Sequence, residues 1–206
     1  MKLIRSVSHH GAEGGATQLA RKTLGRAARV FHNSIDFLVY RLDDLDVEPV
    51  ALAEGDLVEL TMEELLAAGY FKAVEAPDEM ERRFRQGETC LGLFFGDELG
   101  HVSWMVPGFL PIDRGISPVP VKGAVGIYDM FTLGEFRGRG AQTAALAELS
   151  RVAYRKGYRT AVAGIYENNA PSRHVFEKVG FRNIGTLRYR RTLWVERVRV
   201  PELHLD

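Results

Sequence analysis

The hydrophobic positions of this chain switch several times between the period of a strand and the period of a helix. Apolar runs rich in β-branched and aromatic residues predict a sheet of six to seven strands. These predicted strands are residues 35–42, 89–95, 98–106, 124–133, 158–166, 182–190 and 192–200. Apolar positions three and four residues apart predict helices at residues 16–32, 56–68, 79–86, 143–156 and 171–179. Together they predict an α/β (α+β) chain in which the helices flank the sheet.

Glycine and proline mark where these elements end. The predicted helices stop at Gly69, Gly87, Gly157 and Gly180, because glycine adopts the left-handed conformation that closes a helix at little cost. Four of the eight prolines fall within residues 107–122, which predicts a loop there. A loop of that length is either a functional rim over a site or a disordered segment.

Length and composition narrow the class of protein. A chain of 206 residues that is 46% hydrophobic predicts one folded domain over residues 35–206, preceded by a leader and amphipathic helix over residues 1–34. The 27 basic and 27 acidic residues balance, so neither nucleic acid nor a membrane is expected as a partner. The single cysteine, Cys90, excludes an internal disulfide, and no apolar run reaches the ~18 residues of a membrane span. We expect a soluble, cytoplasmic protein without a metal site.

One stretch, residues 127–149, combines an apolar strand, a loop rich in glycine and arginine, and a segment of good helix formers. The loop holds three glycines and two arginines: Gly134, Arg137, Gly138, Arg139 and Gly140. Glycines let the backbone approach a ligand closely, and the first N–H groups of the helix point toward it. Strand, loop and helix in this order therefore predict a site for a phosphate group.

The loop by itself is a weak signal. No Gly-Lys-Ser/Thr follows, and Thr143 occupies the third glycine position of the dinucleotide-binding pattern, so neither phosphate motif is complete. A strand-to-helix turn that needs flexible residues is the simpler alternative. The segment of residues 169–181, Asn-Ala-Pro-Ser-Arg-His-Val-Phe-Glu-Lys-Val-Gly-Phe, about thirty residues downstream, adds the second half of a larger pattern.

Together these two segments resemble the GNAT superfamily of acyl-CoA-dependent N-acyltransferases over residues 124–190. The first is similar to the family's R/Q-x-x-G-x-G/A coenzyme A loop, and the second to its N-x-x-S-x-x-x-Y-E-K-x-G-F segment. The resemblance implies a mixed, mostly antiparallel sheet whose central strands, 124–133 and 158–166, splay apart, with about four helices around it. It also implies that acetyl-CoA or another acyl-CoA is the cosubstrate, and that the acyl group passes directly to a primary amine of a small molecule or amino sugar.

The family pattern assigns coenzyme-binding roles to residues of both segments. The central strand, the loop and the second helix supply them: Met130, Phe131, Thr132, Arg137, Gly138, Arg139, Gly140, Ala141, Gln142, Thr143, Asn169, Ser172 and Phe176. Two of these depart from the pattern. Gln142 stands where the loop ends in Gly or Ala, and Phe176 replaces the tyrosine that protonates the departing thiolate in many members. A phenyl ring cannot donate a proton.

The family pattern therefore does not identify the general base or the proton donor in this sequence. Family members place a general base on the central strand, where Asp129 is the nearest carboxylate; a structural Asp at a bulge of this strand is the alternative. For the thiolate, Tyr166 and His174 are candidates, and a proton from solvent is a third option because a thiol of pKa ~8.5 is a tolerable leaving group. On its strand, His101 either faces the acceptor or, as is more common for a strand histidine, is packed and hydrogen-bonded.

Charge is distributed unevenly along the chain. No Lys or Arg occurs between Arg41 and Lys72, a segment rich in Asp and Glu, whereas residues 182–199 are strongly basic. The acidic segment either attracts a cationic amine or is an exposed surface, and the basic closing strands are candidates for pairing in a homodimer. Two competing functions remain: acylation of a protein lysine or N-terminus, and a non-catalytic acyl-CoA-binding module, which Phe176 motivates.

Overall fold

The computed structural model describes residues 32–52, 54–68, 77–112, 116–192 and 195–202. The leader and the helix predicted over residues 16–32 lie outside this part, except that His32 begins a strand. The chain divides into two compact units, which are described separately. Of the described residues, one unit holds those within 36–187 and 200–202, and the other holds those within 32–35 and 188–199.

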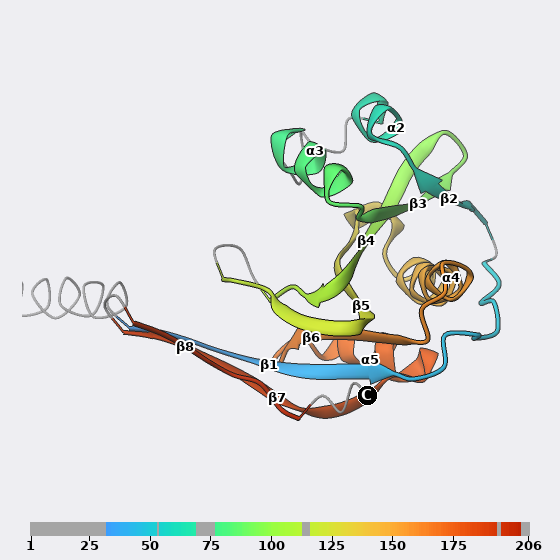
Figure 1. Cartoon of the computed structure of the whole chain (residues 1–206). Coiled ribbons are helices and arrows are strands. Elements are labelled where there is room, and N and C mark those ends of the chain that lie inside the picture. Colours follow the sequence, from blue (N-terminus) through green and yellow to red (C-terminus); the bar gives the residue numbers. More distant parts are fainter. Residues whose placement is uncertain (1–31, 53, 69–76, 113–115, 193–194, 203–206) are drawn as a thin grey trace, which may run out of the picture. The chain divides into compact units, whose positions relative to one another are not determined.

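Strands and helices alternate in the order that the sequence patterns predict, with one additional strand. The elements are β1 (His32–Leu42), β2 (Asp56–Leu60), α2 (Met62–Ala67), α3 (Pro77–Arg85), β3 (Thr89–Phe95), β4 (Glu98–Leu110), β5 (Val119–Thr132), η2 (Gly134–Phe136), α4 (Ala141–Arg155), β6 (Thr160–Tyr166), α5 (Ala170–Val179), β7 (Arg182–Thr192) and β8 (Val195–Arg199) (Figure 1). Gly180 ends α5 in the left-handed conformation, with φ of 105°, as predicted.

The strands form one sheet of eight in the order β2-β3-β4-β5-β6-β1-β7-β8. Consecutive strands from β2 to β5 pair antiparallel, and so do β1 with β6 and β7 with β8. β5 and β6 run parallel, and their pairing covers just residues 124–126 and 160–162. The prediction of a mixed, mostly antiparallel sheet with a splayed central pair is confirmed, although the sheet has eight strands rather than six or seven.

Within the larger unit, two pairs of helices pack on opposite faces of the sheet and bury different side chains. On one face α4 and α5 pack against Leu91, Met105 and Ile127 of the central strands. On the other face α2 and α3 bury Leu65 and Met80 against the strand residues Leu60, Cys90 and Trp104. The alternation of Cys90 and Leu91 between these two clusters follows from the two-residue period of a strand. In Figure 1, α2 and α3 lie together at a distance from α4.

The helix predicted over residues 56–68 is wrong in its first half. Asp56–Leu60 forms β2 and pairs antiparallel with β3, from Asp56 opposite Phe94 to Leu60 opposite Cys90. The helix begins only after Thr61, whose hydroxyl accepts a hydrogen bond from the Glu64 N–H while the Glu64 carboxylate accepts one from the Thr61 N–H. This capping box fixes the helix start and leaves the preceding five residues free to extend the sheet.

The predicted loop over residues 107–122 is also too long at both ends. β4 continues to Leu110 and β5 starts at Val119, with Phe109 opposite Pro120. The register shifts between Pro107 and Phe109, and Gly108 between them has φ of 73°. A bulge of this kind gives a proline a place within a strand pair, since the ladder is already interrupted there.

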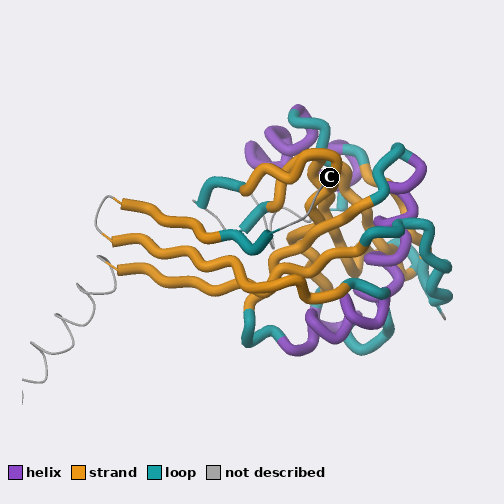
Figure 2. Tube along the Cα trace, turned by 60° about the horizontal axis from the view of Figure 1, so that its bottom comes forward, coloured by secondary structure: helices purple, strands orange, loops and turns teal. Residues whose placement is uncertain are grey.

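The smaller unit contains the paired ends of β7 and β8. Arg188 lies opposite Arg199 and Arg190 opposite Arg197, and the Arg190 guanidinium donates a hydrogen bond to the Ile35 carbonyl at 3.3 Å. Figure 2 shows these ends and the first residues of β1 as three adjacent strands. This unit therefore carries the basic charge expected of the closing strands.

Candidate active site

A large cavity opens where the two central strands separate. After Gly126 and Val162, β5 and β6 no longer pair, so their facing N–H and C=O groups are available to a ligand. The cavity has a volume of about 1380 Å³ and is lined by residues of both strands, from Ile127 to Thr132 on one side and from Ala163 to Tyr166 on the other. Its location is the position predicted for the pantetheine arm of coenzyme A.

A β-bulge shapes the strand that borders this cavity. Tyr128 pairs with Trp104 and Phe131 with Val102, so β5 holds one more residue than β4 over this stretch. Within it, Asp129 has φ of 44°, a left-handed conformation that Asp tolerates better than most residues. Beyond the extra residue, the side chains of β5 that would have faced one side of the sheet face the other. Tyr128 and Phe131 consequently both pack against the α2–α3 cluster, while Met130 packs against the cluster of α4 and α5.

The glycine loop leads into α4 with the geometry of an anion cradle. Gly138 and Gly140 have φ of 78° and 80°, and Gly140 is the N-cap residue without a side-chain hydrogen bond to the helix. A Cβ added at Gly138 would meet no atom within 4 Å. The N–H groups of residues 141–143 have no acceptor within the helix, because the residues four positions before them lie outside it. These open amides, with residues 140–143 lining the cavity, fit a diphosphate.

The two arginines of the loop lie in different places. Arg137 lines the cavity, and its Nε donates a hydrogen bond to the Thr132 carbonyl at 3.1 Å. Arg139 is not among the lining residues; its guanidinium lies over the ring of Phe136 and 3.7 Å from the Glu54 carboxylate. Of the two, only Arg137 is therefore placed to face an anion in the cavity.

The second segment is tied to the first at the mouth of the cavity. Asn169 caps α5, accepting a hydrogen bond from the Ser172 N–H at 3.2 Å. The Gln142 side-chain amide in turn donates to the Ser172 hydroxyl at 3.5 Å. Gln142, the departure from the loop pattern, thus connects α4 to α5.

Phe176 and Tyr166 both line the cavity, but in different environments. Phe176 is 3% exposed and packs edge-on against Phe181 and beside Tyr40. Tyr166 is 41% exposed at the end of β6, with its ring 4.5 Å from that of Phe37. His174 is exposed on α5 and is not among the lining residues. Of the two acid candidates, the structure places only Tyr166 at the cavity.

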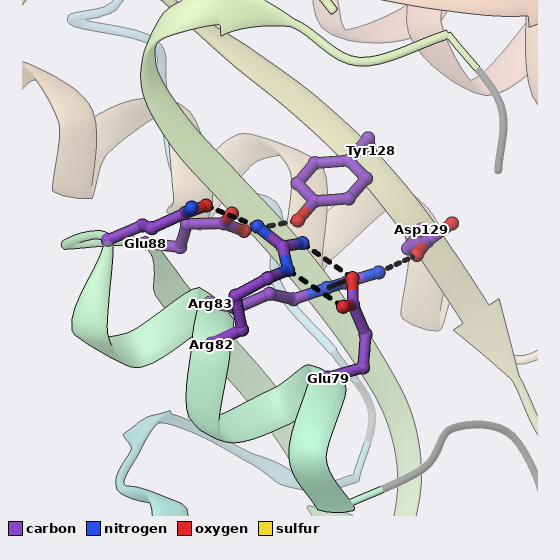
Figure 3. Close-up of polar contacts among 7 residues, drawn as sticks. Glu79, Arg82, Arg83, Glu88, Tyr128 and Asp129 are labelled. Atoms are coloured by element: carbon purple, nitrogen blue, oxygen red, sulfur yellow. Dashed lines mark hydrogen bonds and ion pairs between the residues drawn. The ribbon is translucent and has the colours of Figure 1, made fainter. Parts of the chain in front are cut away.

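Asp129 lies in the cavity wall, but Arg83 holds its carboxylate. The Arg83 Nη2 donates to Asp129 Oδ2 at 2.5 Å, and its Nε lies 3.4 Å from Glu79 Oε1 (Figure 3). The Arg83 side chain is only 4% exposed, and its guanidinium lies over the rings of Trp104 and Tyr128, 4.9 and 4.7 Å from their centroids. Asp129 thus lies at a bulge of the strand, as in the structural alternative, and its ion pair with Arg83 also connects the bulge to α3.

A second carboxylate, Glu88, faces the same cavity between α3 and β3. Glu88 is 7% exposed and accepts a hydrogen bond from the Tyr128 hydroxyl (Figure 3). Burial raises its pKa; the hydrogen bond from Tyr128 and the charges of Arg83 and Arg82 oppose that rise. Burial likewise raises the pKa of the Tyr128 phenol. Sequence reasoning did not identify Glu88 or Arg83; the Glu79–Arg83 spacing of four residues on one helix is the signal that was available.

The far end of the cavity is mainly apolar. Eight residues from β1, from the end of β4 and from the segment that follows it line this part: Phe37, Val106, Pro107, Phe109, Pro111, Ile112, Ile116 and Pro118. The charged residues Glu79, Arg82 and Glu88 line the same cavity. The described residues of the proline-rich segment therefore form part of the cavity wall. Of the two interpretations of this segment, this favours a rim over a site.

His101 is part of the sheet and not of the cavity lining. It is 1% exposed, and its ring nitrogens lie 2.7 Å from the Thr132 hydroxyl and 2.6 Å from the Ser103 hydroxyl. Burial lowers the pKa of His101 to about 4, so the ring is neutral at physiological pH. The prediction of a packed, hydrogen-bonded histidine is confirmed.

Comparison with known proteins supports one family. A model of the "Acetyltransferase (GNAT) family" matches residues 59–181, more than half of the chain. No curated protein matches the chain. None of the helices in the described ranges is long and apolar enough to cross a membrane.

Solved structures share the fold at low sequence identity. A Drosophila protein is 16% identical with a TM-score of 0.58, covering 85% of this chain and 58% of its own. A GCN5-related N-acetyltransferase from Kribbella flavida is 13% identical with a TM-score of 0.55, covering 89% of this chain and 65% of its own. A GCN5-related N-acetyltransferase-like protein from Streptococcus suis is 10% identical with a TM-score of 0.51, covering 87% and 68%. The chain thus spans only about three fifths of the length of the first of these structures.

Proposed function

Because the chain belongs to the GNAT acetyltransferase family, we propose that it transfers an acetyl or other short acyl group from acyl-CoA to a primary amine. The transfer is direct, within a ternary complex of protein, acyl-CoA and amine. The observation that carries this proposal is the position of the open α4 N-terminus at the cavity between the splayed strands. One cavity thus offers an anion cradle and a reaction centre.

Acyl-CoA supplies the activated thioester, and the chain's residues bind and orient it. The amides of residues 141–143 and the Arg137 side chain hold the diphosphate, since unpaired N–H groups at a helix N-terminus and a guanidinium both favour an anion. The unpaired edge of β5 over residues 130–132 hydrogen-bonds the amides of the pantetheine arm. Asn169 and Ser172 keep α5 beside the loop, and Phe176 packs against the arm.

The acceptor occupies the end of the cavity away from the glycine loop. The apolar lining there favours an amine attached to an apolar body, because burying that body removes hydrophobic surface from water. The three carboxylates of Glu79, Glu88 and Asp129 outnumber the paired Arg82 and Arg83 by one in the same cavity, and this excess negative charge favours the cationic amine itself. Among the two acceptor classes first considered, this favours a small-molecule amine over an amino sugar, which would need more polar partners.

The reaction requires two proton transfers. A primary amine of pKa ~10.4 is protonated at neutral pH and must lose a proton before its nitrogen attacks. The thiolate that leaves must gain one, and Tyr166 is the proton donor that we assign, since its side chain lines the cavity and Phe176 has no proton to give. His174 has no place in this scheme. Asp129, already paired with Arg83, acts on the shape of the strand.

Thiol release from acetyl-CoA tests the proposal. The purified chain is incubated with acetyl-CoA and with 2-phenylethylamine, hexylamine, glucosamine or a lysine-containing peptide. We expect turnover with the first two amines and much slower turnover with the sugar. Fastest release with the peptide would point to protein acylation instead.

A binding module is the second candidate function, and Phe176 at the position of the family's acid is the observation that favours it. Tight acetyl-CoA binding without thiol release on any of these amines is the result that would select the module over the enzyme.

A further inference from the structure

Three carboxylates line the cavity within the described part of the chain, and two of them are neutralised by arginines. Asp129 is 2.5 Å from the Arg83 guanidinium. Glu79 accepts hydrogen bonds from Arg82 at 2.7 and 2.5 Å, and these bonds hold its pKa below the ordinary value. A carboxylate that is held in an ion pair is a weak base, because taking up a proton costs the pair. Glu79 is therefore a weak base, and the ion pair with Arg83 gives Asp129 a positioning role.

Glu88 has a different environment. Its hydrogen-bond donor is the neutral hydroxyl of Tyr128, and Arg82 and Arg83 act on it as nearby charges. Its position immediately after α3 is fixed by a hydrogen bond from its own N–H to the Arg83 carbonyl at 3.1 Å. The side chain is nearly buried and still lines the cavity.

Tyr128 connects this carboxylate to the reaction centre. It stands directly before the bulge residue of β5, at the level where β5 has already separated from β6. The Arg83 guanidinium lies over its ring and fixes the orientation of the hydroxyl toward Glu88. Tyr128, Glu88 and residues 130–132 line the same cavity, so the Tyr128 hydroxyl links the space beside the thioester to a buried carboxylate.

We propose that Glu88 is the general base of the acyl transfer and that Tyr128 relays the proton to it. This inference rests on the proposed function. The ammonium group gives a proton to the Tyr128 oxygen while the Tyr128 hydroxyl gives its own proton to Glu88, so Tyr128 stays neutral and Glu88 becomes a carboxylic acid. The amine lone pair then forms the C–N bond and the C–S bond breaks. Tyr166 gives its phenol proton to the thiolate and takes up the remaining extra proton of the nitrogen. Glu88 returns its proton to solvent between cycles.

The groups around Glu88 are consistent with this role. From α3 the charges of Glu79, Arg82 and Arg83 act on it, and from β5 it faces Tyr128; Asp129 lies beyond the arginines (Figure 3). Burial and Glu79 disfavour the charged carboxylate, while both arginines favour it. The net rise in its pKa makes Glu88 a stronger base than a solvated carboxylate.

The first test compares pH–rate profiles of acetyl transfer to 2-phenylethylamine for Glu88→Gln, Tyr128→Phe and Asp129→Asn. We expect Glu88→Gln to lower kcat by about 10²–10⁴-fold and to remove the acid limb of the profile, with the acetyl-CoA Kd changed by less than about threefold. Tyr128→Phe lowers kcat and keeps an acid limb, since Glu88 remains. If Asp129→Asn removes the acid limb and Glu88→Gln keeps it, the assignment is overturned in favour of Asp129.

A second measurement needs no acceptor. Urea unfolding of wild type and Glu88→Gln is followed from pH 4 to pH 8. Since the pKa of the folded Glu88 lies above its ordinary value of 4.5, ionisation destabilises the folded protein, and wild type loses stability relative to the variant as pH rises. If the difference in unfolding free energy between wild type and Glu88→Gln does not change with pH, the assignment of Glu88 as the base is overturned. If wild type releases no thiol with any amine, the proposed function itself fails. If wild type is active and Glu88→Gln keeps both its rate and its pH–rate profile, only the assignment of Glu88 fails.

Discussion

Arg83 is the side chain on which the charged end of the cavity depends, and its replacement by methionine is the sharpest structural test. The guanidinium is bound to Asp129 and Glu79 and covered by two aromatic rings. Methionine keeps the length of the apolar stem while it removes the charge and all hydrogen-bond donors. The variant leaves Asp129 without its cationic partner at the β5 bulge.

The expected loss of stability follows from these contacts. Removing one member of a buried ion pair costs about 3–5 kcal/mol, and desolvated cation–π contacts contribute about 2 kcal/mol. The Asp129 side chain is 51% exposed, so water solvates the carboxylate that is left behind and reduces the loss. We expect Arg83→Met to lower the free energy of unfolding by about 2–4 kcal/mol.

Arg82→Met is the matched control, because Arg82 is the neighbouring residue of the same helix and also pairs with Glu79. Its side chain is 46% exposed, and a surface pair of this kind contributes about 0–1 kcal/mol. Urea unfolding of both variants, followed by tryptophan fluorescence, gives the comparison directly. Equal losses in the two variants would refute the view that Arg83 is a buried organising charge.

Three further predictions concern other parts of the larger unit. Gly126→Ala places a Cβ 2.1 Å from the Phe109 carbonyl oxygen, so we expect a loss of about 1–3 kcal/mol in urea unfolding, whereas Gly164→Ala, with no contact closer than 3.6 Å, stays near wild type. His101 has a pKa of about 4 in the folded protein against 6.5 when unfolded, so stability is lost as pH falls between these values, by roughly 3 kcal/mol in total. His101→Gln should flatten the pH dependence of the unfolding free energy over this range; an unchanged pH dependence would assign it to other groups. Phe176→Tyr restores a proton donor beside the cavity and should raise kcat if thiolate protonation limits turnover; an unchanged kcat places that role on Tyr166 or solvent.

The sequence was most informative where a local signal determines the structure. Gly180 after α5 and the Asn169 cap before it mark a helix whose ends the structure reproduces to within one residue. The glycines before α4 likewise predicted both the turn and the open helix N-terminus. β2 was missed because five residues carry too little periodicity to be separated from the helix that follows.

The acceptor end of the cavity could not be predicted for a different reason. Arg83 and Asp129 are 46 residues apart in the sequence, and Tyr128 and Glu88 are 40 apart. Their contacts exist only because β4 and β5 pair in a register that includes the bulge, and a one-residue change of register moves every following side chain to the other face. The sequence raised a bulge at Asp129 only as one of two alternatives and could not indicate that Glu88 lies in the same cavity.

Calorimetric titration of acetyl-CoA into Gly140→Asp and Gly140→Asn tests the central claim, that the α4 N-terminus binds the diphosphate. Both side chains have the same shape and tolerate the left-handed conformation, and a Cβ at this position meets only Leu52, at 3.9 Å. A carboxylate within about 4 Å of the diphosphate costs at least ~1 kcal/mol, so we predict acetyl-CoA affinity at least about fivefold weaker for Asp than for Asn. Equal affinities in the two variants would contradict the claim.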